Sequence, residues 1–420
     1  MGTARELRLS SDSTLELHPL QVRREGDAYI VGRFGAGSYL VMQEPALDTL
    51  ALLRQGIPLG RVKRELALRH GEPDVAIRSF LETLFAARFV KAVDGLSLDE
   101  ADTPAATRAV LLSRRRVAWL FAPGMLAVYA TVLLLGVLAL VVEPAHVPRL
   151  RDLRVSDRYA VVAGLMLVLT LLMAAKHELA HLVAARFVGV DATIGIGHRF
   201  FFPVLQTNLT ELWSVARAKR FIAYAAGILS DLLVVALALV ALELSTLGVW
   251  ALASGIQQVL KALVALGALM VLWQLNVFFR TDVYYMVSDA LGCRDLYADG
   301  WRQVRVWARR LGGRPAGPRP LASSRHERAI IAIYAALVLL GHAVYVLAGL
   351  VYLAHLAVFL LTGSSTVLSA GAPARDDPVD RLTAALLLLL TAGLLTWSLV
   401  HRRRHARAAV DYRLRSDPGL

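Results

Sequence analysis

Six apolar stretches, each long enough to cross a bilayer, constrain this 420-residue chain more than any other feature. A helix needs about 20 apolar residues to span roughly 30 Å of hydrocarbon. Hydrophobic residues make up 56% of the chain, which disfavours an ordinary soluble protein. The sequence therefore predicts a mainly α-helical, polytopic membrane protein. The predicted spans cover residues 117–142, 158–185, 220–242, 248–279, 329–361 and 382–400.

The distribution of Arg and Lys predicts how these spans are oriented. Basic residues concentrate at 114–116, at 186–220, at 280–328 and after residue 400, and six spans place all four regions on one side. Since basic loops are retained in the cytoplasm, we expect both termini there. An alternative remains open for 329–361, which is long enough to hold a broken pair of helices.

The charge and the cysteine content limit the chemistry of the chain. Its net charge is +13, but basic loops beside membrane spans account for this, so we expect no nucleic-acid partner. Cys293 is the one cysteine, so the chain can form neither an internal disulfide nor a zinc site of several thiolates. Any metal ion must be held by His, Asp or Glu side chains.

Residues 1–113 contain no apolar run that could cross a bilayer, and they predict a separate domain. Strands followed by three helices are typical of a small α+β domain of the winged-helix type. A membrane domain at 114–400 and a basic tail at 401–420 complete the predicted organisation. The expected strands of the first domain are 15–22, 28–33, 38–43 and 89–93, and its expected helices are 45–55, 59–70 and 73–89.

The sequence His177-Glu178-Leu179-Ala180-His181, near the end of the second span, carries the chemistry. Residues four apart share one face of a helix, so both imidazoles can bind one metal ion while Glu178 lies beside them. Such polar groups are unfavourable inside a membrane span and need a compensating partner. The pattern predicts a zinc site with a neighbouring general base. Alternatively, the three side chains only satisfy one another within the bundle.

A hydrolytic zinc site needs a third protein ligand and an open position for water. The second and fourth spans both run towards the cytoplasm, so their carboxyl ends lie at the same depth, where Asp282 can meet the two histidines. Asp231 lies further inside the third span, too deep for this geometry, and is the second choice. The acidic residues considered as the third ligand are Asp191, Glu211, Asp231, Asp282 and Asp289.

The histidine motif and the later stretch LNVFFRTDVYY at 275–285 resemble the site-2 protease family of intramembrane zinc metallopeptidases. The similarity is greatest to the bacterial branch of peptide zinc metalloproteases, and it covers about residues 158–295. Val277 stands where that branch has proline, and Val283 stands where it has glycine. Neither valine replaces a ligand, but both change the loop that presents Asp282.

The resemblance implies a role for each motif residue. His177, His181 and Asp282 would bind zinc, and Glu178 would take a proton from water and hand it to the leaving amine. Asn276 would help to hold the substrate or the oxyanion, although it could instead cap the end of a helix.

Two further segments gain an interpretation from resemblance. In the family, the region equivalent to 189–213 forms strands or a hairpin at the membrane face, where an open strand edge can pair with an unwound substrate. The domain at 1–113 resembles the PqqD-like modules that capture the leader of ribosomally made peptides by strand addition. Alternatively, it is an ordinary winged-helix regulatory domain.

These features together predict a zinc metalloendopeptidase in a bacterial plasma membrane. It would cut a peptide or a membrane-anchored precursor near the cytoplasmic face, as in leader removal from a ribosomally synthesised modified peptide. The alternative is a catalytically inactive relative that binds or escorts a peptide for export. A third possibility, a membrane-anchored DNA-binding sensor, requires salt-sensitive DNA binding and no metal.

Overall fold

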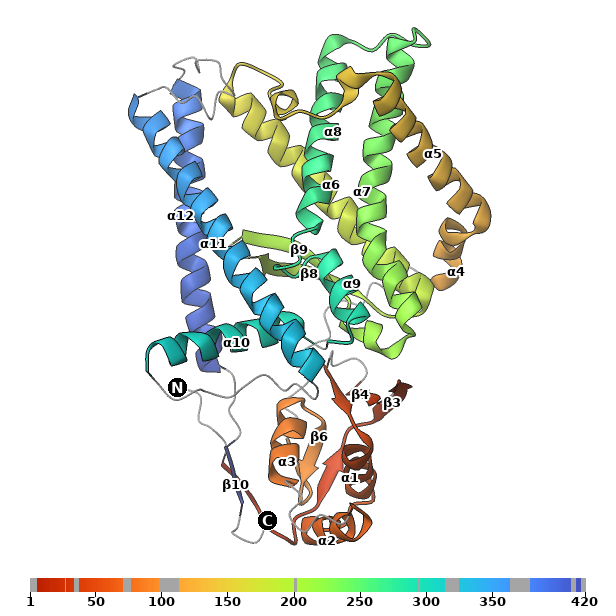
Figure 1. The fold of residues 1–420 in the computed structure, drawn as a ribbon, viewed down its shortest axis with the longest axis vertical. Coiled ribbons are helices and arrows are strands. Elements are labelled where there is room, and N and C mark those ends of the chain that lie inside the picture. Colours follow the sequence, from red (N-terminus) through yellow and green to blue (C-terminus); the bar gives the residue numbers. More distant parts are fainter. Residues whose placement is uncertain are drawn as a thin grey trace.

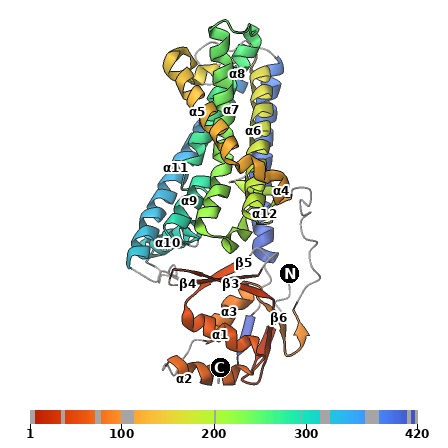
Figure 2. The same cartoon turned by 90° about the vertical axis from the view of Figure 1, so that its right-hand side faces the viewer.

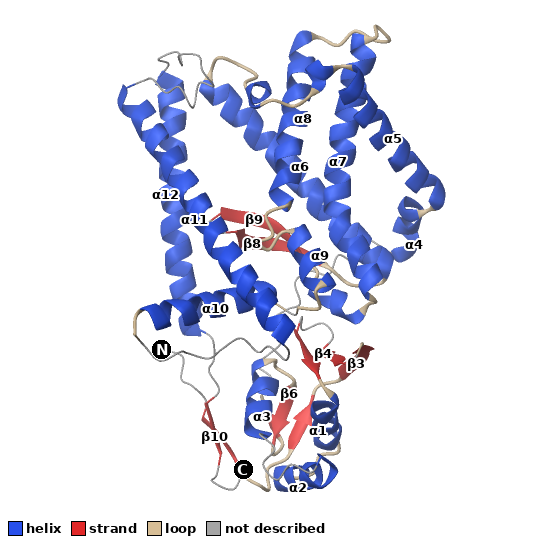
Figure 3. Ribbon diagram, viewed as in Figure 1, coloured by secondary structure: helices blue, strands red, loops and turns tan. Residues whose placement is uncertain are grey.

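A computed structural model shows a small mixed domain beneath a bundle of long helices (Figures 1 and 2). In Figure 3 the strands gather in this N-terminal domain and in one hairpin among the helices. We call the end of the bundle that faces the N-terminal domain the domain end. The structure describes residues 6–26, 28–33, 38–70, 77–98, 113–199, 202–293, 295–313, 325–362, 378–408 and 413–416.

The N-terminal domain contains two small antiparallel sheets and three helices. One sheet has the strand order β3-β4-β5, and the other has the order β2-β6-β7. Its strands are β2 (Leu15–Leu17), β3 (Leu20–Glu25), β4 (Ala28–Arg33), β5 (Ser38–Met42), β6 (Val90–Val93) and β7 (Leu96–Ser97). Its helices are α1 (Glu44–Arg54), α2 (Leu59–His70) and α3 (Ile77–Ala86).

One apolar core joins these elements, except for the exposed strand β7. Leu50 and Leu53 of α1, Leu66 of α2 and Leu84 of α3 are each at most 1% exposed. The spacing of three residues in α1 places its leucines on one face, as expected for an amphipathic helix. Burying each such side chain contributes roughly 1.5–3 kcal/mol. The domain therefore has a core of its own beside the membrane domain.

The structure refines the elements predicted for this domain. The expected strand 15–22 is two strands in different sheets, because Pro19 offers no backbone N–H and interrupts the ladder between them. The expected helix 73–89 is α3, which ends in a turn where Arg88 has a φ of +55°. Residues 73–76 of that prediction lie outside the described residues.

Five helices in the described part of the chain are long and apolar enough to cross a membrane, which indicates a membrane protein. They correspond to the first five predicted spans. The sixth predicted span falls within α12 (Pro378–Ala408), which is not among these five helices. Helix α12 also covers the start of the predicted tail. The five are α5 (Pro123–Val142), α6 (Tyr159–Val188), α7 (Arg217–Thr246), α8 (Ser254–Gln274) and α11 (Arg325–Thr362).

The fourth span is shorter than predicted, and this difference positions the site. Instead of continuing to residue 279, α8 ends at Gln274, and a short turn leads into α9 (Asp282–Ala290). The side chain of Asn276 closes the end of α8, because its amide donates to the carbonyl oxygen of Trp273 at 2.9 Å. A new helix therefore begins at Asp282 near the domain end of the bundle (Figure 1).

Shorter elements connect the long helices. The expected hairpin between the second and third spans is present as β8 (Thr193–Arg199) paired antiparallel with β9 (Phe202–Asn208). Helix α10 (Leu296–Leu311) runs across the base of the bundle (Figure 1). The strands β1 (Glu6–Leu9) and β10 (Arg413–Ser416) pair in parallel, which brings the two ends of the described chain together. The remaining short helices are α4 (Arg114–Val117), η1 (Ala118–Phe121), η2 (Pro144–His146), η3 (Leu150–Leu153) and η4 (Thr210–Ser214).

A contact between distant helices fixes the start of α6. The side chain of Asp380 on α12 is 1% exposed and accepts two backbone hydrogen bonds, from Tyr159 N at 3.0 Å and from Ala160 N at 2.8 Å. The first N–H groups of a helix have no partner within the helix. Asp380 therefore caps the helix that carries the histidine motif, and its negative charge suits the positive end of the helix dipole.

Candidate metal centre

Helix α6 presents both histidines of the motif towards the interior of the bundle. His177 and His181 are buried, and their four-residue spacing places them on the same helix face. Glu178, the next residue after His177, is half-buried. The local arrangement predicted from the motif is therefore present.

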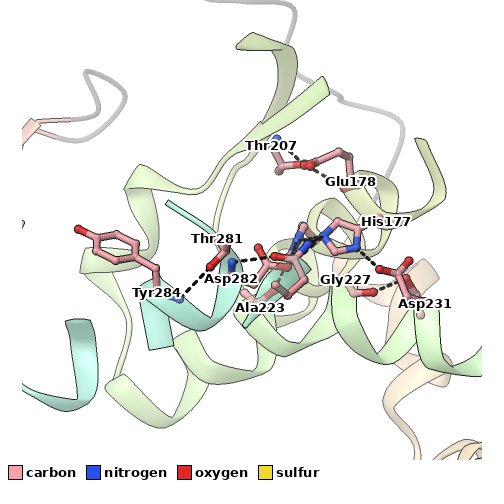
Figure 4. Close-up of polar contacts among 12 residues, drawn as sticks. His177, Glu178, Thr207, Ala223, Gly227, Asp231, Thr281, Asp282 and Tyr284 are labelled. Atoms are coloured by element: carbon pink, nitrogen blue, oxygen red, sulfur yellow. Dashed lines mark hydrogen bonds and ion pairs between the residues drawn. The ribbon is translucent and has the colours of Figure 1, made fainter. Parts of the chain in front are cut away.

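Helix α9 brings a carboxylate to the two imidazoles. Thr281 caps this helix, because its side chain accepts the backbone N–H of Tyr284 at 3.3 Å, and Asp282 is the first helical residue. Asp282 Oδ2 lies 3.0 Å from His177 Nε2 and 3.2 Å from His181 Nε2. The two Nε2 atoms are 3.1 Å apart. Figure 4 shows this convergence of α6 and α9.

The hydrogen-bond partners of the two Nδ1 atoms determine which ring nitrogen of each histidine carries the proton. His177 Nδ1 lies 2.8 Å from a carboxylate oxygen of Asp231, and His181 Nδ1 lies 2.8 Å from the carbonyl oxygen of Ala223. Both oxygens can only accept, so both Nδ1 atoms donate. In the neutral imidazoles each Nε2 then carries a lone pair, and both lone pairs face Asp282.

With both imidazoles neutral, three acceptor atoms converge without a proton between them. Asp282 Oδ2 is buried and accepts no hydrogen bond from the described residues. Ligands bound to one tetrahedral zinc ion at roughly 2.0–2.1 Å lie about 3.3 Å from one another, close to the three separations found here. A buried group of this kind is unfavourable unless a cation neutralises it. The cluster of His177, His181 and Asp282 could therefore hold a metal ion.

Helix α7 leaves room for this cluster at Gly227. A Cβ atom at this position would lie 2.5 Å from both His177 Nε2 and His181 Nε2. That separation is well below van der Waals contact, so any larger residue would displace the imidazoles. Glycine is needed here for the close approach of α7 and not for an unusual backbone angle.

Asp231 lies behind the cluster and contacts the Nδ1 side of His177. Its side chain is fully buried, and its second carboxylate oxygen accepts a hydrogen bond from Lys176 Nζ. Lys176 also donates to Ser230 Oγ at 3.1 Å. The expectation that Asp231 lies too deep is wrong, because α7 crosses α6 so that Asp231 reaches the back of His177. It supports this imidazole and faces away from Asp282 (Figure 4).

Glu178 contacts the hairpin. Its Oε2 accepts the backbone N–H of Thr207 at 2.6 Å, and its own carbonyl oxygen accepts the Thr207 hydroxyl at 2.9 Å. Thr207 belongs to β9, so this strand runs past the carboxylate that follows the first histidine (Figure 4). The outer edge of β9 and Glu178 therefore share one side of the site.

The other acidic candidates lie outside the cluster. Asp191 forms an ion pair with Arg186, and Asp289 forms one with Arg220 at 2.9 Å. Glu211 lies in η4. The structure thus brings only one of the five predicted carboxylates to the metal-facing nitrogens of His177 and His181.

The amide side chain beside the cluster is not the one expected from the sequence. Asn276 closes the end of α8, which is the alternative considered for it. Gln274, which sequence reasoning missed, is buried beside the cluster: its Oε1 accepts the backbone N–H of Asp282 at 3.2 Å, and its Nε2 lies 3.5 Å from His177 Nε2. A glutamine at the end of an apolar helix was the available signal.

The two valines that depart from the family pattern leave Asp282 in place. The carbonyl oxygen of Val277 accepts the hydroxyl of Tyr334 at 2.8 Å, which ties the turn to α11. Val283 lies within α9, whose cap at Thr281 is intact.

Comparisons with protein-family models, with curated proteins and with solved structures gave no match.

Proposed function

We propose that the chain is a zinc-dependent endopeptidase of the membrane. The observation that carries this proposal is the convergence of two imidazole lone pairs and one carboxylate, with Glu178 on the same helix turn. Two histidines and a carboxylate are a zinc-type donor set, and three protein ligands leave one position open, as hydrolysis requires. Metal-binding histidines typically donate their other ring N–H to a carboxylate or a carbonyl oxygen, as His177 and His181 do to Asp231 and Ala223.

The residues divide the chemistry between them. Zinc bound to His177, His181 and Asp282 would supply Lewis-acid activation of water and of the scissile carbonyl group. Glu178 would accept the proton released by the water and then donate it to the leaving amine. Its present hydrogen bond to Thr207 holds the carboxylate on the hairpin side, where the peptide would enter.

The proposed substrate is a peptide or a membrane-anchored precursor. The hairpin favours this class, because an exposed backbone edge can hold a substrate in the extended form that cleavage requires. The N-terminal domain would bind the leader of a ribosomally synthesised modified peptide, and the centre would remove that leader. We place the protein in a bacterial plasma membrane with both termini in the cytoplasm, in keeping with the basic residues near the domain end.

A peptide-escort protein without catalysis is the second candidate. Binding of a leader peptide by the N-terminal domain would suit such a role as well. The two candidates differ in their need for Glu178, since an escort protein would require no general base.

Metal analysis of the detergent-purified protein tests the proposal. We expect about one zinc ion per chain after dialysis against zinc, its loss in Asp282→Ala, and its retention in the control Asp191→Ala. Asp191 is a suitable control because it lies just after α6 and outside the cluster, where it forms an ion pair with Arg186. A wild-type protein that binds no zinc would overturn the proposal.

Cleavage then separates the two candidates. Labelled single-span peptides, reconstituted with the protein in vesicles, serve as substrates. We expect Glu178→Gln to retain zinc and to lose at least about 100-fold in cleavage rate, while the exposed control Glu65→Gln stays active. Zinc binding without cleavage by the wild type would favour the escort protein, whereas equal cleavage by wild type and Glu178→Gln would refute the role of Glu178 as the general base.

A further inference from the structure

A buried arginine at the start of α7 joins the N-terminal domain to the membrane domain. Arg220 is 6% exposed. Its guanidinium donates to Asp289 Oδ1 at 2.9 Å and to Glu25 Oε2, and also to the carbonyl oxygen of Val215 at 3.0 Å. Glu25 ends strand β3 of the N-terminal domain, whereas Asp289 lies on α9. One side chain thus bridges two separate parts of the molecule.

The two carboxylates depend on this arginine. Asp289 lies in the last turn of α9, where the helix dipole disfavours a negative charge. Burial raises the pKa of Asp289, whereas Arg220 and Arg217 act in the opposite direction. Removing one partner from a buried charge network is strongly destabilising, because it leaves an uncompensated charge. The network therefore holds α9 and β3 in a defined relative position.

An apolar contact next to this network fits the same two parts together. The indole ring of Trp213, in η4, lies against β4, and a Cβ atom on Gly32 would be 2.2 Å from it. The ring of Tyr39 on β5 stacks on the same indole with centroids 6.2 Å apart. Gly32 has no positive φ, so glycine is required there by the approach of Trp213 alone.

The network continues directly into the metal centre. Arg220, Ala223, Gly227 and Asp231 follow one another on α7 at intervals of three or four residues, so they share one buried face. Ala223 accepts from His181, Gly227 gives the imidazoles room, and Asp231 accepts from His177. The helix face that lines the metal centre thus begins at the residue that binds the N-terminal domain.

We propose that docking of the N-terminal domain through Arg220 positions α9 and thereby the candidate ligand Asp282. Asp282 is the first residue of the nine-residue helix α9 and Asp289 lies in its last turn, so a shift at one end is transmitted to the other. Arg220 acts as a positioning residue, and the N-terminal domain is part of the support of the metal centre. The inference rests on the proposed function only in treating Asp282 as a ligand.

Hydrogen exchange of the metal-free, full-length protein tests the coupling without any bound ion. Two variants weaken the interface from the domain side: Glu25→Gln removes the charge, and Gly32→Ala introduces the clash with Trp213. We expect α9 amides to exchange at least about tenfold faster in both, with unchanged exchange in α2 of the N-terminal domain. Unchanged exchange of α9 in both variants would refute the coupling.

Matched controls separate this role from a general effect of charge. Arg217 lies in the same turn and contacts the same two carboxylates, but it is 47% exposed and its distances are 3.4 and 3.6 Å. Exposed pairs contribute little, so Arg217→Gln should change α9 exchange less than Glu25→Gln does. Glu16→Gln, an exposed change in the same domain, should have no effect. Equal effects from all three charge variants would contradict the specific role of Arg220.

Metal retention provides a second, independent measurement. Zinc-loaded Glu25→Gln and Gly32→Ala should lose zinc to a chelator at least about tenfold faster than the Glu16→Gln control. If no variant and no wild type binds zinc, the proposed function fails, yet faster α9 exchange would still support the coupling. If zinc binds and leaves at the same rate in every variant, the coupling fails and the proposed function stands.

Discussion

Asp231 and Asp282 contact opposite nitrogens of the same imidazole. Asp231 Oδ2 lies 2.8 Å from His177 Nδ1, whereas Asp282 Oδ2 lies 3.0 Å from Nε2. The first contact fixes the tautomer and the orientation of the ring, and the second defines its open coordination side. Two carboxylates of equal charge therefore have different roles, and these roles can be separated experimentally.

Substituting Asp231 by alanine should weaken zinc binding without abolishing it. We expect an affinity loss of about 10- to 100-fold, because the imidazole loses its orienting acceptor but keeps its lone pair. Competition with a coloured chelator measures the affinity, and Asp191→Ala is the control. If Asp231→Ala lost zinc as completely as Asp282→Ala, Asp231 would be a ligand instead.

Substituting Gly227 by alanine should abolish zinc binding while α7 remains helical. A Cβ atom there would lie 2.5 Å from both Nε2 atoms, whereas alanine itself favours a helix by about 1 kcal/mol over glycine. Gly164→Ala on α6 is the matched control, because nothing lies within 4 Å of its Cβ position. Metal analysis and circular dichroism provide the two measurements. Normal zinc content in Gly227→Ala would show that the cluster tolerates the lost space.

Removing the carboxylate of Asp380 should destabilise the bundle by about 2 kcal/mol. The change leaves the N–H groups of Tyr159 and Ala160 without their acceptor and removes a favourable charge from the start of α6. Thermal unfolding of Asp380→Ala in detergent measures the loss. Asp157→Ala is the control, since that side chain is 86% exposed. Equal midpoints in the two variants would contradict the capping role.

The single thiol should react slowly and only at high pH. Burial raises the pKa of Cys293 to about 11, and the nearby carboxylates of Glu327 and Asp299 act in the same direction. Only the thiolate is nucleophilic, so alkylation should accelerate about tenfold per pH unit from pH 7 to 10 without reaching a plateau. Iodoacetamide labelling followed by mass spectrometry measures this rate. An exposed thiol, Asp157→Cys in a Cys293→Ser chain, should instead level off near pH 9.

The sequence predicted those parts of the molecule that follow from local spacing or from chain direction. Histidines four residues apart indicated one shared helix face, and the shared direction of the second and fourth spans pointed to Asp282 at the depth of His177. The family resemblance implied strands or a hairpin at 189–213, and the structure has the β8–β9 hairpin. The first two of these inferences needed only the period of a helix and the thickness of a bilayer.

Contacts that depend on how two helices are rotated could not be predicted. The position of Asp231 behind His177 requires the crossing of α6 and α7, which no periodicity specifies. Gln274 reaches Asp282 because α8 ends earlier than its apolar run suggests. The approach of Trp213 to Gly32 joins segments of two different domains, and neither segment carries a local signal of the other.

The cap on α6 has a consequence for the order in which the protein is made. Asp380 follows Tyr159 by 221 residues, so the helix with the histidine motif leaves the ribosome long before its cap is synthesised. Until α12 is in place, the first N–H groups of α6 lack that acceptor. The complete support of the metal-binding helix therefore forms late in biogenesis, so a chain that stops before α12 would carry both histidines on a helix without its final anchor.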